Sequence, residues 1–245
     1  MILYGLTDIG TARRENQDCY GLRLLDEDIS VAVVCDGMGG AQAGNVASTV
    51  AVNAFLSTVE EMYEEKGPSV DPAHMLHTAC RRANQVVYEM AQANEEYQGM
   101  GTTLVGAYFL RGEAYLVNVG DSRCYLICDR GIEQLTQDHS LVQLLVNRGE
   151  LTPEQARCHP RKNLITRALG VDPEVNEDLY RTHLCGGDSL LLCSDGLINV
   201  LTDEQILEIL RRSPGAQAQC NALLQATLEQ GAPDNVTVVL AQMDT

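Results

Sequence analysis

Two short stretches of the chain share one design, an apolar run that ends in an aspartate followed directly by a glycine. Residues 30–35 lead into Asp36-Gly37, and residues 189–194 lead into Asp195-Gly196. Each run has the length of one buried strand, so each delivers a carboxylate at a strand end, and the glycine lets the backbone come close to whatever that carboxylate holds. A third acid, Asp234, directly precedes the apolar run 236–240. Carboxylates presented in this way are typical ligands of hard cations such as Mg²⁺ and Mn²⁺.

A second group of chemically capable residues lies in segment 7–18, which contains Arg13 and Asp18. The planar fork of arginine can bind a phosphate through two parallel hydrogen bonds. Two divalent cations about 3.5–4 Å apart can polarise a phosphoryl oxygen and lower the pKa of a bridging water, but they need several carboxylates. The candidates are Asp18, Asp36, Asp121, Asp195 and Asp234. Neither a G-x-S-x-G motif nor a P-loop is present, which is consistent with direct attack by water on phosphorus.

Taken one at a time, these aspartates have a simpler explanation. Asp-Gly is a common turn, and aspartate often caps a helix. The combination favours a site, because three of the acids stand at the ends of apolar strands. For Gly196, a turn remains the simpler role.

Composition narrows the classes of partner. The chain has 245 residues without a repeat or a linker, which predicts a single domain over 1–245. Its 34 acidic and 17 basic residues give a formal net charge of -17, which disfavours general binding of nucleic acid or an anionic membrane. No secretory signal or membrane-spanning run is present, and the nine cysteines show no CxxC spacing, so we expect a reducing cytoplasm.

The hydrophobic pattern predicts grouped strands and helices. We expect strands at 3–6, 20–24, 31–35, 102–110, 114–119, 124–128, 189–193 and 236–240. We expect helices at 43–65, 71–95, 140–147, 152–158, 202–210 and 217–228. The polar segment at about 137–173, rich in glycine, arginine and proline, is an excursion from the core. Hairpin-length connections between the strands indicate antiparallel sheets with helices packed outside, rather than a doubly wound parallel sheet.

The order of the motifs resembles a known family. The string Asp8-x-Gly10-x-x-Arg13-x-x-Asn16-Gln17-Asp18 is followed by Asp36-Gly37-Met38-Gly39-Gly40, Gly101-Thr102-Thr103, Gly120-Asp121-Ser122-Arg123, Ser194-Asp195-Gly196 and Asp234-Asn235-Val236-Thr237. Over nearly its whole length the chain is similar to the metal-dependent protein phosphatases of type 2C (the PPM family), in particular to the compact bacterial members that oppose Ser/Thr kinases. The resemblance implies an α+β fold, a four-layer αββα sandwich in which two antiparallel β-sheets pack face to face with helices outside.

The resemblance also implies roles for the candidate residues. Asp36 would bridge two Mn²⁺ or Mg²⁺ ions, with the carbonyl of Gly37 on one of them, and Asp195 and Asp234 would complete the other. Asp18 would orient metal-bound water, and Asp121 with Asp195 would help to hold a weaker third ion. Arg13 would clamp the phosphate while a hydroxide that bridges the metals attacks it. Segment 137–173 corresponds to the flap of the family, where His159 and Arg161 are candidates for substrate contact.

Two positions depart from the family pattern. Many relatives have glutamate where this chain has Gln17, and many bacterial relatives have a histidine where it has Ala41. A histidine there could protonate the leaving alkoxide. The general acid is therefore open between metal-bound water and His159, for which a structural or surface role is the simpler reading.

The basic residues also leave alternatives open. Arg161, Lys162 and Arg167 either form a basic rim for a phosphopeptide or pair with Glu150, Glu154 or Asp172. Arg14 is assigned to a surface salt bridge rather than to the phosphate.

The favoured function is that of a cytoplasmic, monomeric, metal-dependent Ser/Thr phosphatase acting on phosphorylated proteins, including a Ser/Thr kinase. Gln17 and Ala41 keep open a second hypothesis, a catalytically weak member that serves as a metal- or phosphoprotein-binding module. A third is a phosphatase dedicated to one regulatory partner. Turnover with Mn²⁺ separates the first two.

Overall fold

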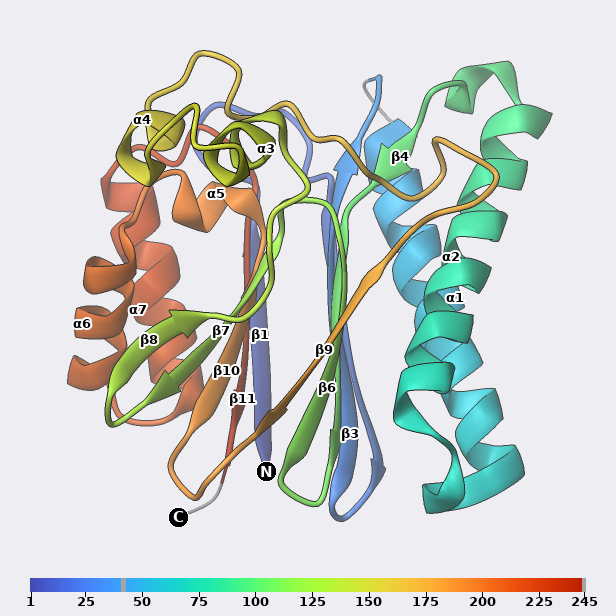
Figure 1. The fold of residues 1–245 in the computed structure, drawn as a ribbon, viewed down its shortest axis with the longest axis horizontal. Helices are drawn as coiled ribbons and strands as arrows, with labels where there is room; N and C mark the ends of the chain where they lie inside the picture. The colour runs from blue at the N-terminus through green and yellow to red at the C-terminus, as the bar shows by residue number, and fades with distance from the viewer. Residues whose placement is uncertain (41–42, 244–245) are drawn as a thin grey trace.

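The computed structural model of the protein describes residues 1–40 and 43–243. Its strands form two antiparallel sheets that face each other, and helices cover both outer surfaces (Figure 1). The expected αββα sandwich is confirmed. None of the described helices combines the length and the apolar character that crossing a membrane requires.

The strands are arranged out of sequence order within each sheet. The first sheet contains, in spatial order, β1 (Ile2–Asp8), β11 (Val236–Gln242), β10 (Ser189–Cys193), β7 (Arg123–Cys128) and β8 (Gly131–Gln134). The second contains β2 (Asp18–Asp26), β3 (Ile29–Met38), β5 (Leu104–Leu110), β6 (Glu113–Val119) and β9 (Asp178–His183), and the short β4 (Gly101–Thr102) pairs with β3.

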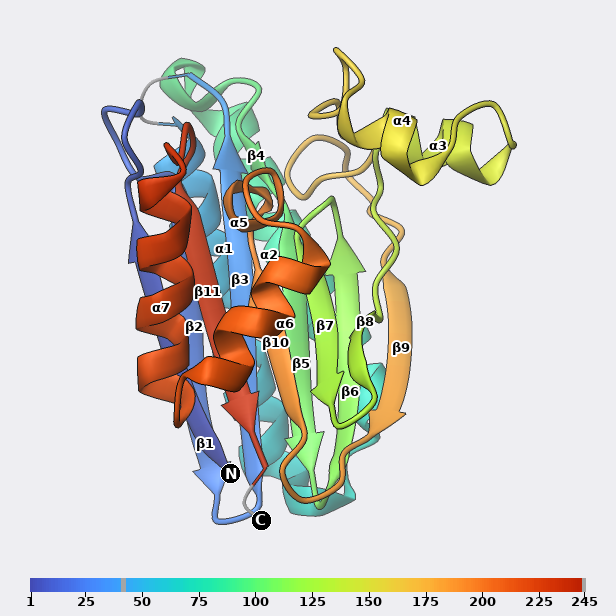
Figure 2. The same ribbon diagram turned by 90° about the vertical axis from the view of Figure 1, so that its left-hand side faces the viewer.

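The long helices pack outside the sheets, and the short ones lie at one end of the sandwich (Figures 1 and 2). The second sheet is covered by α1 (Ala43–Lys66) and α2 (Pro72–Ala93), and the first by α6 (Asp203–Arg212) and α7 (Ala216–Glu229). The upper end carries α5 (Asp195–Ile198) and, in segment 137–173, α3 (Leu141–Asn147) and α4 (Pro153–Arg157). Two 3₁₀ turns, Gly67–Ser69 and Glu95–Tyr97, complete the set of described helical elements.

Local sequence determines where several helices begin. Asp71 caps α2 by accepting a hydrogen bond from the His74 N–H, and proline follows at the first helical position. Thr202 caps α6 through a capping box with Gln205, and Thr152 starts α4 in the same way. These starts agree with the predicted helices at 71–95, 202–210 and 152–158.

The apolar strands are continuous because both of their faces are buried. On β3, Val31, Val33 and Cys35 pack against the helices, whereas Ala32 and Val34 join the core between the sheets. On β10 the same alternation places Leu191 and Cys193 toward the helices, and Leu190 and Leu192 between the sheets. A strand in the middle of such a sandwich has no polar face, which explains the unbroken apolar runs.

Two strands and one helix were not predicted, and the predicted strand 102–110 is divided into β4 and β5. The sequence of β9, Asp178–His183, alternates half-buried with exposed side chains and carries few apolar residues, so its pairing with β6 is decided by tertiary context. β8 begins inside a region predicted to be a turn, β4 is only two residues long, and α5 is a single turn. All nine cysteines lie within the described residues and are free, in agreement with the absence of a readable disulfide framework.

Candidate active site

Asp18 and Asp36 lie opposite each other on neighbouring strands. The register of β2 and β3 pairs these two residues directly. Side chains alternate along a strand, and Tyr20 on β2 and Val34 on β3 both pack in the core between the sheets. Asp18 and Asp36 continue these two rows, so their carboxylates lie at the end of the inter-sheet core, facing the first sheet.

Asp18 joins the two sheets through hydrogen bonds. Its Oδ2 accepts from the hydroxyls of Ser194 and Thr237, each at 2.7 Å. Its Oδ1 is buried and has no hydrogen-bond partner. Burial raises the pKa of Asp18 to about 7, although both hydroxyl donors favour the charged form. The carboxylate is thus fixed in place with one oxygen free to bind a cation.

The backbone around Asp36 is held by the Gly-Thr-Thr motif. The N–H of Asp36 donates to Thr103 Oγ1 at 2.9 Å, and the carbonyl of Asp36 accepts from the Thr103 N–H and from Thr102 Oγ1. Thr103 Oγ1 also contacts Ser122 Oγ at 2.7 Å, which links this strand end to the loop that carries Asp121. Burial, followed by the charge of Asp18, raises the pKa of Asp36 well above its usual range.

Gly37 is a position of close backbone approach. A Cβ there would lie 2.0 Å from the carbonyl oxygen of Gly44 and 2.7 Å from that of Gln17. The Gly37 N–H donates to the Gln17 carbonyl at 3.0 Å. Any side chain at this position would push the start of α1 away from β3, so the motif requires glycine here.

Asp195 begins α5 at the end of β10. Its Oδ2 accepts from Asn199 Nδ2 at 2.8 Å, and its Oδ1 is buried without a partner. Burial, with the charge of Asp234, raises the pKa of Asp195 to about 6. Gly196 is more than a turn residue, because a Cβ would lie 1.9 Å from the carbonyl oxygen of Asn235.

Asp234 and Arg13 form an ion pair. Arg13 Nη2 lies 2.7 Å from Asp234 Oδ2, and the Arg13 side chain is 52% exposed. The hydrogen bond to Asp234 raises the pKa of Arg13, and the charges of Asp36 and Asp195 act in the same direction. Gly10, with a φ of 74°, lets the N-terminal loop pass beside Asp234, because a Cβ would lie 2.1 Å from the Asp234 carbonyl oxygen. The structure thus brings the predicted phosphate clamp to the predicted metal ligands.

Asn235 organises this loop, a role that the sequence alone does not predict. Its Nδ2 donates to the carbonyls of Ile9 and Glu15 at 2.9 and 3.0 Å, and its Oδ1 accepts from the Gln17 N–H at 2.9 Å. The side chain therefore fixes both ends of the segment that carries Arg13. The signal in the sequence that could have indicated this role is the position of Asn235 directly after Asp234 in the motif Asp234-Asn235-Val236-Thr237.

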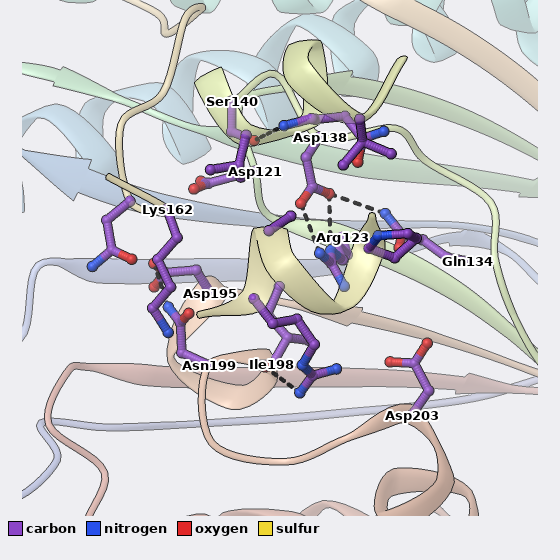
Figure 3. A pocket seen from close by; sticks show the side chains of 17 residues that line it. Asp121, Arg123, Gln134, Asp138, Ser140, Lys162, Asp195, Ile198, Asn199 and Asp203 are labelled. Atoms are coloured by element: carbon purple, nitrogen blue, oxygen red, sulfur yellow. Dashed lines mark hydrogen bonds and ion pairs between the residues drawn. The ribbon is translucent and has the colours of Figure 1, made fainter. Parts of the chain in front are cut away.

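A cavity of about 370 Å³ lies beneath segment 137–173 and opens onto Asp121 and Asp195. Asp121 is 8% exposed, and burial, then the charge of Asp195, raises its pKa well above the usual range. Figure 3 shows Lys162 reaching from this segment toward Asp195 and Asn199. Opposite them, Arg123 makes a two-pronged contact with Asp138, with N–O distances of 2.8 and 2.7 Å (Figure 3).

The five aspartates suit divalent cations in their chemistry. Among the described residues, no three acidic, histidine or cysteine side chains already stand together as a cluster around one point. Asp18 is held by hydroxyls, Asp195 by Asn199 and Asp234 by Arg13. The orphaned buried oxygens of Asp18 and Asp195, and the mutual repulsion of Asp18, Asp36 and Asp195, show negative charge in excess of its local compensation. An all-oxygen donor set of this kind fits Mg²⁺ or Mn²⁺.

The structure places two predicted substrate contacts away from the cavity. His159 and Arg161 lie at a shallow surface hollow with Leu164, and His159 Nδ1 accepts the N–H of Arg161 at 3.1 Å. Lys162 lines both this hollow and the cavity. Ala41, the position at which many bacterial relatives have a histidine, lies outside the described residues.

Arg167 pairs with none of the acids predicted for it. It contacts Asp178 of β9 at 3.0 Å and lies 3.2 Å from His139. The predicted partners Glu150, Glu154 and Asp172 were chosen because they are close to Arg167 in sequence. The observed partner, Asp178, belongs to β9, a strand that the sequence did not predict. Arg14 is exposed, and the described ion pairs include none at this residue.

An αββα sandwich with several aspartates and an arginine at one end of its two sheets defines the class of metal-dependent protein phosphatases. A family model described as protein phosphatase 2C matches residues 11–230. The chain therefore belongs to the protein phosphatase 2C family.

Individual relatives agree with this assignment over nearly their full length. The chain is 36% identical over 242 residues to the serine/threonine phosphatase Stp of Listeria monocytogenes, covering 97% of this chain and 94% of that protein. The crystal structure of the serine/threonine phosphatase Stp1 from Staphylococcus aureus superimposes with a TM-score of 0.90 at 36% identity, over 99% of this chain and 95% of that one. The catalytic domain of the phosphatase PstP, solved in complex with two manganese ions, gives a TM-score of 0.87 at 35% identity, over 100% and 98% of the two chains.

Proposed function

We propose that this protein is a metal-dependent phosphatase that hydrolyses phosphoserine and phosphothreonine in proteins. The observation that carries the proposal is the directly opposed pair of Asp18 and Asp36 together with Asp195. One buried carboxylate oxygen of Asp18 and one of Asp195 have no hydrogen-bond partner. The solved relative that contains two manganese ions supports the choice of metal.

The residues present define which groups would hold the ions. Asp36 and the Gly37 carbonyl would serve one ion, with Asp36 shared by a second that Asp195 and Asp234 complete. Asp18 would support the water position from the neighbouring strand, and Asp121 with Asp195 would offer a weaker third site. When bound, the ions supply Lewis acidity to the phosphoryl group and lower the pKa of water.

Arg13 has a separate role in the proposal. Its guanidinium is held at Asp234 by the carboxylate charge. Neutralisation of Asp234 by a cation would free the planar fork for two parallel hydrogen bonds to a phosphate. Its donors would then face the equatorial oxygens, where negative charge is spread in the transition state.

The cellular setting follows from the same proposal. The substrates are phosphorylated proteins, a Ser/Thr kinase of the same cell among them. The protein acts as a cytoplasmic monomer, and neither nucleic acid nor a membrane surface is expected to attract a chain with a net charge of -17.

Substitution of the proposed ligands tests the function. Asp36→Ala and Asp195→Ala should each lower kcat/KM on a phosphoserine peptide with Mn²⁺ by about a hundredfold or more, as expected when transition-state stabilisation is removed. The exposed Asp129 offers a matched control, and Asp129→Ala should keep the wild-type rate. The unfolding midpoints should show that all three variants fold. More than a few per cent of activity left in Asp36→Ala would refute the assignment.

A further inference from the structure

Arg157, on the flap helix α4, contacts the backbone at the end of α5 and in the turn that follows it. Its Nη2 donates to the carbonyl oxygens of Ile198 and Leu201, at 3.4 and 3.3 Å. Carbonyls at the C-terminal end of a helix lack partners within the helix, and arginine side chains can satisfy them. In a continuing helix the Thr202 N–H would donate to the Ile198 carbonyl. Here it donates instead to Gln205 Oε1, at 2.9 Å, in the capping box of α6.

The turn that receives Arg157 is the one that begins at Asp195. The Asn199 N–H donates to the Asp195 carbonyl at 2.8 Å, and the Leu201 N–H donates to the Leu197 carbonyl at 2.9 Å. Asn199 also binds the Asp195 carboxylate through its side chain. One short run of hydrogen bonds therefore connects the arginine on the flap to the wall that carries a proposed metal ligand.

The contact spans the cavity described above. Arg157 and Ala156 line it from α4, while Asp195, Ile198 and Asn199 line it from the opposite wall. Figure 3 shows Asp195, Asn199 and Ile198 along this wall, with Lys162 beside them. Helices α3 and α4 bury little: Val142 is the one buried residue within these two helices, and Arg157 itself is exposed. A single polar contact on α4 can therefore influence the position of the flap strongly.

We infer that Arg157 is a positioning residue that holds the flap against the α5 turn, so that the cavity beside Asp195 keeps the shape needed to receive a phosphopeptide. The inference rests on the proposed phosphatase function for its substrate, but the contact itself can be tested without turnover. A small aryl phosphate needs only the metal site and Arg13, whereas the peptide on either side of a phosphoserine must pass the flap.

The test compares Arg157→Ala and Arg157→Lys with a matched control, Arg148→Ala. Arg148 is an exposed arginine of the same flap, at the C-terminal end of α3. Hydrogen–deuterium exchange of the metal-free proteins measures the contact. In Arg157→Ala we expect amides in 141–158 and at 197–201 to exchange about three- to tenfold faster, the size expected for the loss of exposed hydrogen bonds to a charged donor.

Steady-state kinetics with Mn²⁺ measures the consequence. The KM of Arg157→Ala for a phosphoserine peptide should rise by about three- to tenfold with little change in kcat, while kcat/KM on an aryl phosphate stays within about twofold. Arg157→Lys should lie between the alanine variant and the wild type, because an ammonium group keeps the positive donor but sits on a shorter side chain than the guanidinium. Arg148→Ala should match the wild type in every measurement.

Three results would overturn the inference. Unchanged exchange at 197–201 would show that the contact does not hold the turn. Equal losses on peptide and aryl phosphate would place the effect at the metal site rather than at the flap. An identical loss in Arg148→Ala would make it a general property of flap charge. If the wild type itself lacks Mn²⁺-dependent turnover, the proposed function fails, while the exchange data still decide whether Arg157 holds the flap to α5.

Discussion

At the residue scale, the proposed active site is a set of carboxylates that repel one another. Asp18, with one oxygen bound by two hydroxyls and the other buried and bare, has its pKa raised to about 7, and burial is the main cause. Asp195 follows at about 6. Such groups are poor contributors to stability as anions but are pre-organised to gain from a cation, which is how a binding site trades stability for function.

This arrangement predicts the pH dependence of stability. The folded state keeps a proton on Asp18 up to a pKa of about 7, whereas the unfolded chain loses it near the ordinary value of 3.8. The stabilisation is therefore complete below pH 3.8 and is lost as the pH rises through about 7. We expect the free energy of unfolding of EDTA-treated protein, measured with urea, to fall between about pH 5 and pH 8.

Asp18→Asn isolates the contribution of this carboxylate. The amide oxygen still accepts from Ser194 and Thr237 but cannot ionise, so the fall in stability should be smaller than in the wild type. It should not vanish, because Asp36 and Asp195 also have raised pKa values. Asp129→Asn, at an exposed position, should keep the wild-type slope. Saturating Mn²⁺ at about pH 8 should restore stability in the wild type more than in Asp18→Asn. A wild-type stability that rises over this range would contradict the argument.

At the scale of elements, the site depends on a loop that has no regular structure of its own. Segment 9–17 is fixed mainly by the side chain of Asn235, which is 5% exposed, and by Thr11, whose N–H and hydroxyl donate to the loop before β11. The position of Arg13 is thus set from the other end of the sequence. These hydrogen bonds hold the backbone that carries Arg13, the proposed phosphate-binding residue.

Removal of that support predicts a combined defect. Asn235→Ala deletes three hydrogen bonds to backbone groups, and we expect unfolding free energy to fall by about 2–4 kcal/mol, since such groups are left unpaired. KM for a phosphopeptide should rise because Arg13 is no longer held in place. Urea unfolding and steady-state kinetics measure the two effects. Asn221→Ala, on the exposed face of α7, should change stability by less than about 0.5 kcal/mol. A stable Asn235→Ala with normal KM would show that other contacts hold the loop.

The elements also show what the sequence could and could not predict. The apolar runs that end at Asp36 and Asp195 were readable because β3 and β10 are buried on both faces, and the helix starts were readable from their caps. β9 was not readable, since its pairing partner decides its conformation. The contacts of Asn235 and Arg157 join residues far apart in sequence, and spacing along one chain carries no information about such pairs. The ion pair between Arg13 and Asp234 was missed for the same reason.

At the scale of the whole molecule, the two sheets divide the site between them. Asp18 and Asp36 come from the second sheet, whereas Asp195 and Asp234 are positioned by strands of the first. The hydrogen bonds from Ser194 and Thr237 to Asp18 tie these halves together at the upper end of the sandwich (Figure 1). A cation bound by carboxylates from both sheets would form a second connection between the sheets. Metal binding should therefore stabilise the whole sandwich rather than one loop.

The overall charge adds a long-range field to this local site. With a formal net charge of -17, the protein should attract phosphopeptides whose flanking residues are basic and repel those whose flanks are acidic. The screening length is about 30 Å at 0.01 M salt and about 8 Å at 0.15 M, so the preference should depend on ionic strength. We expect kcat/KM to favour lysine-flanked over glutamate-flanked phosphoserine peptides by about tenfold at 0.01 M salt, and by much less at 0.5 M. A peptide with neutral flanks should lie between them. Equal discrimination at both salt concentrations would assign the preference to direct contacts near the site, such as those of Asp203 in the cavity, rather than to the field of the whole molecule.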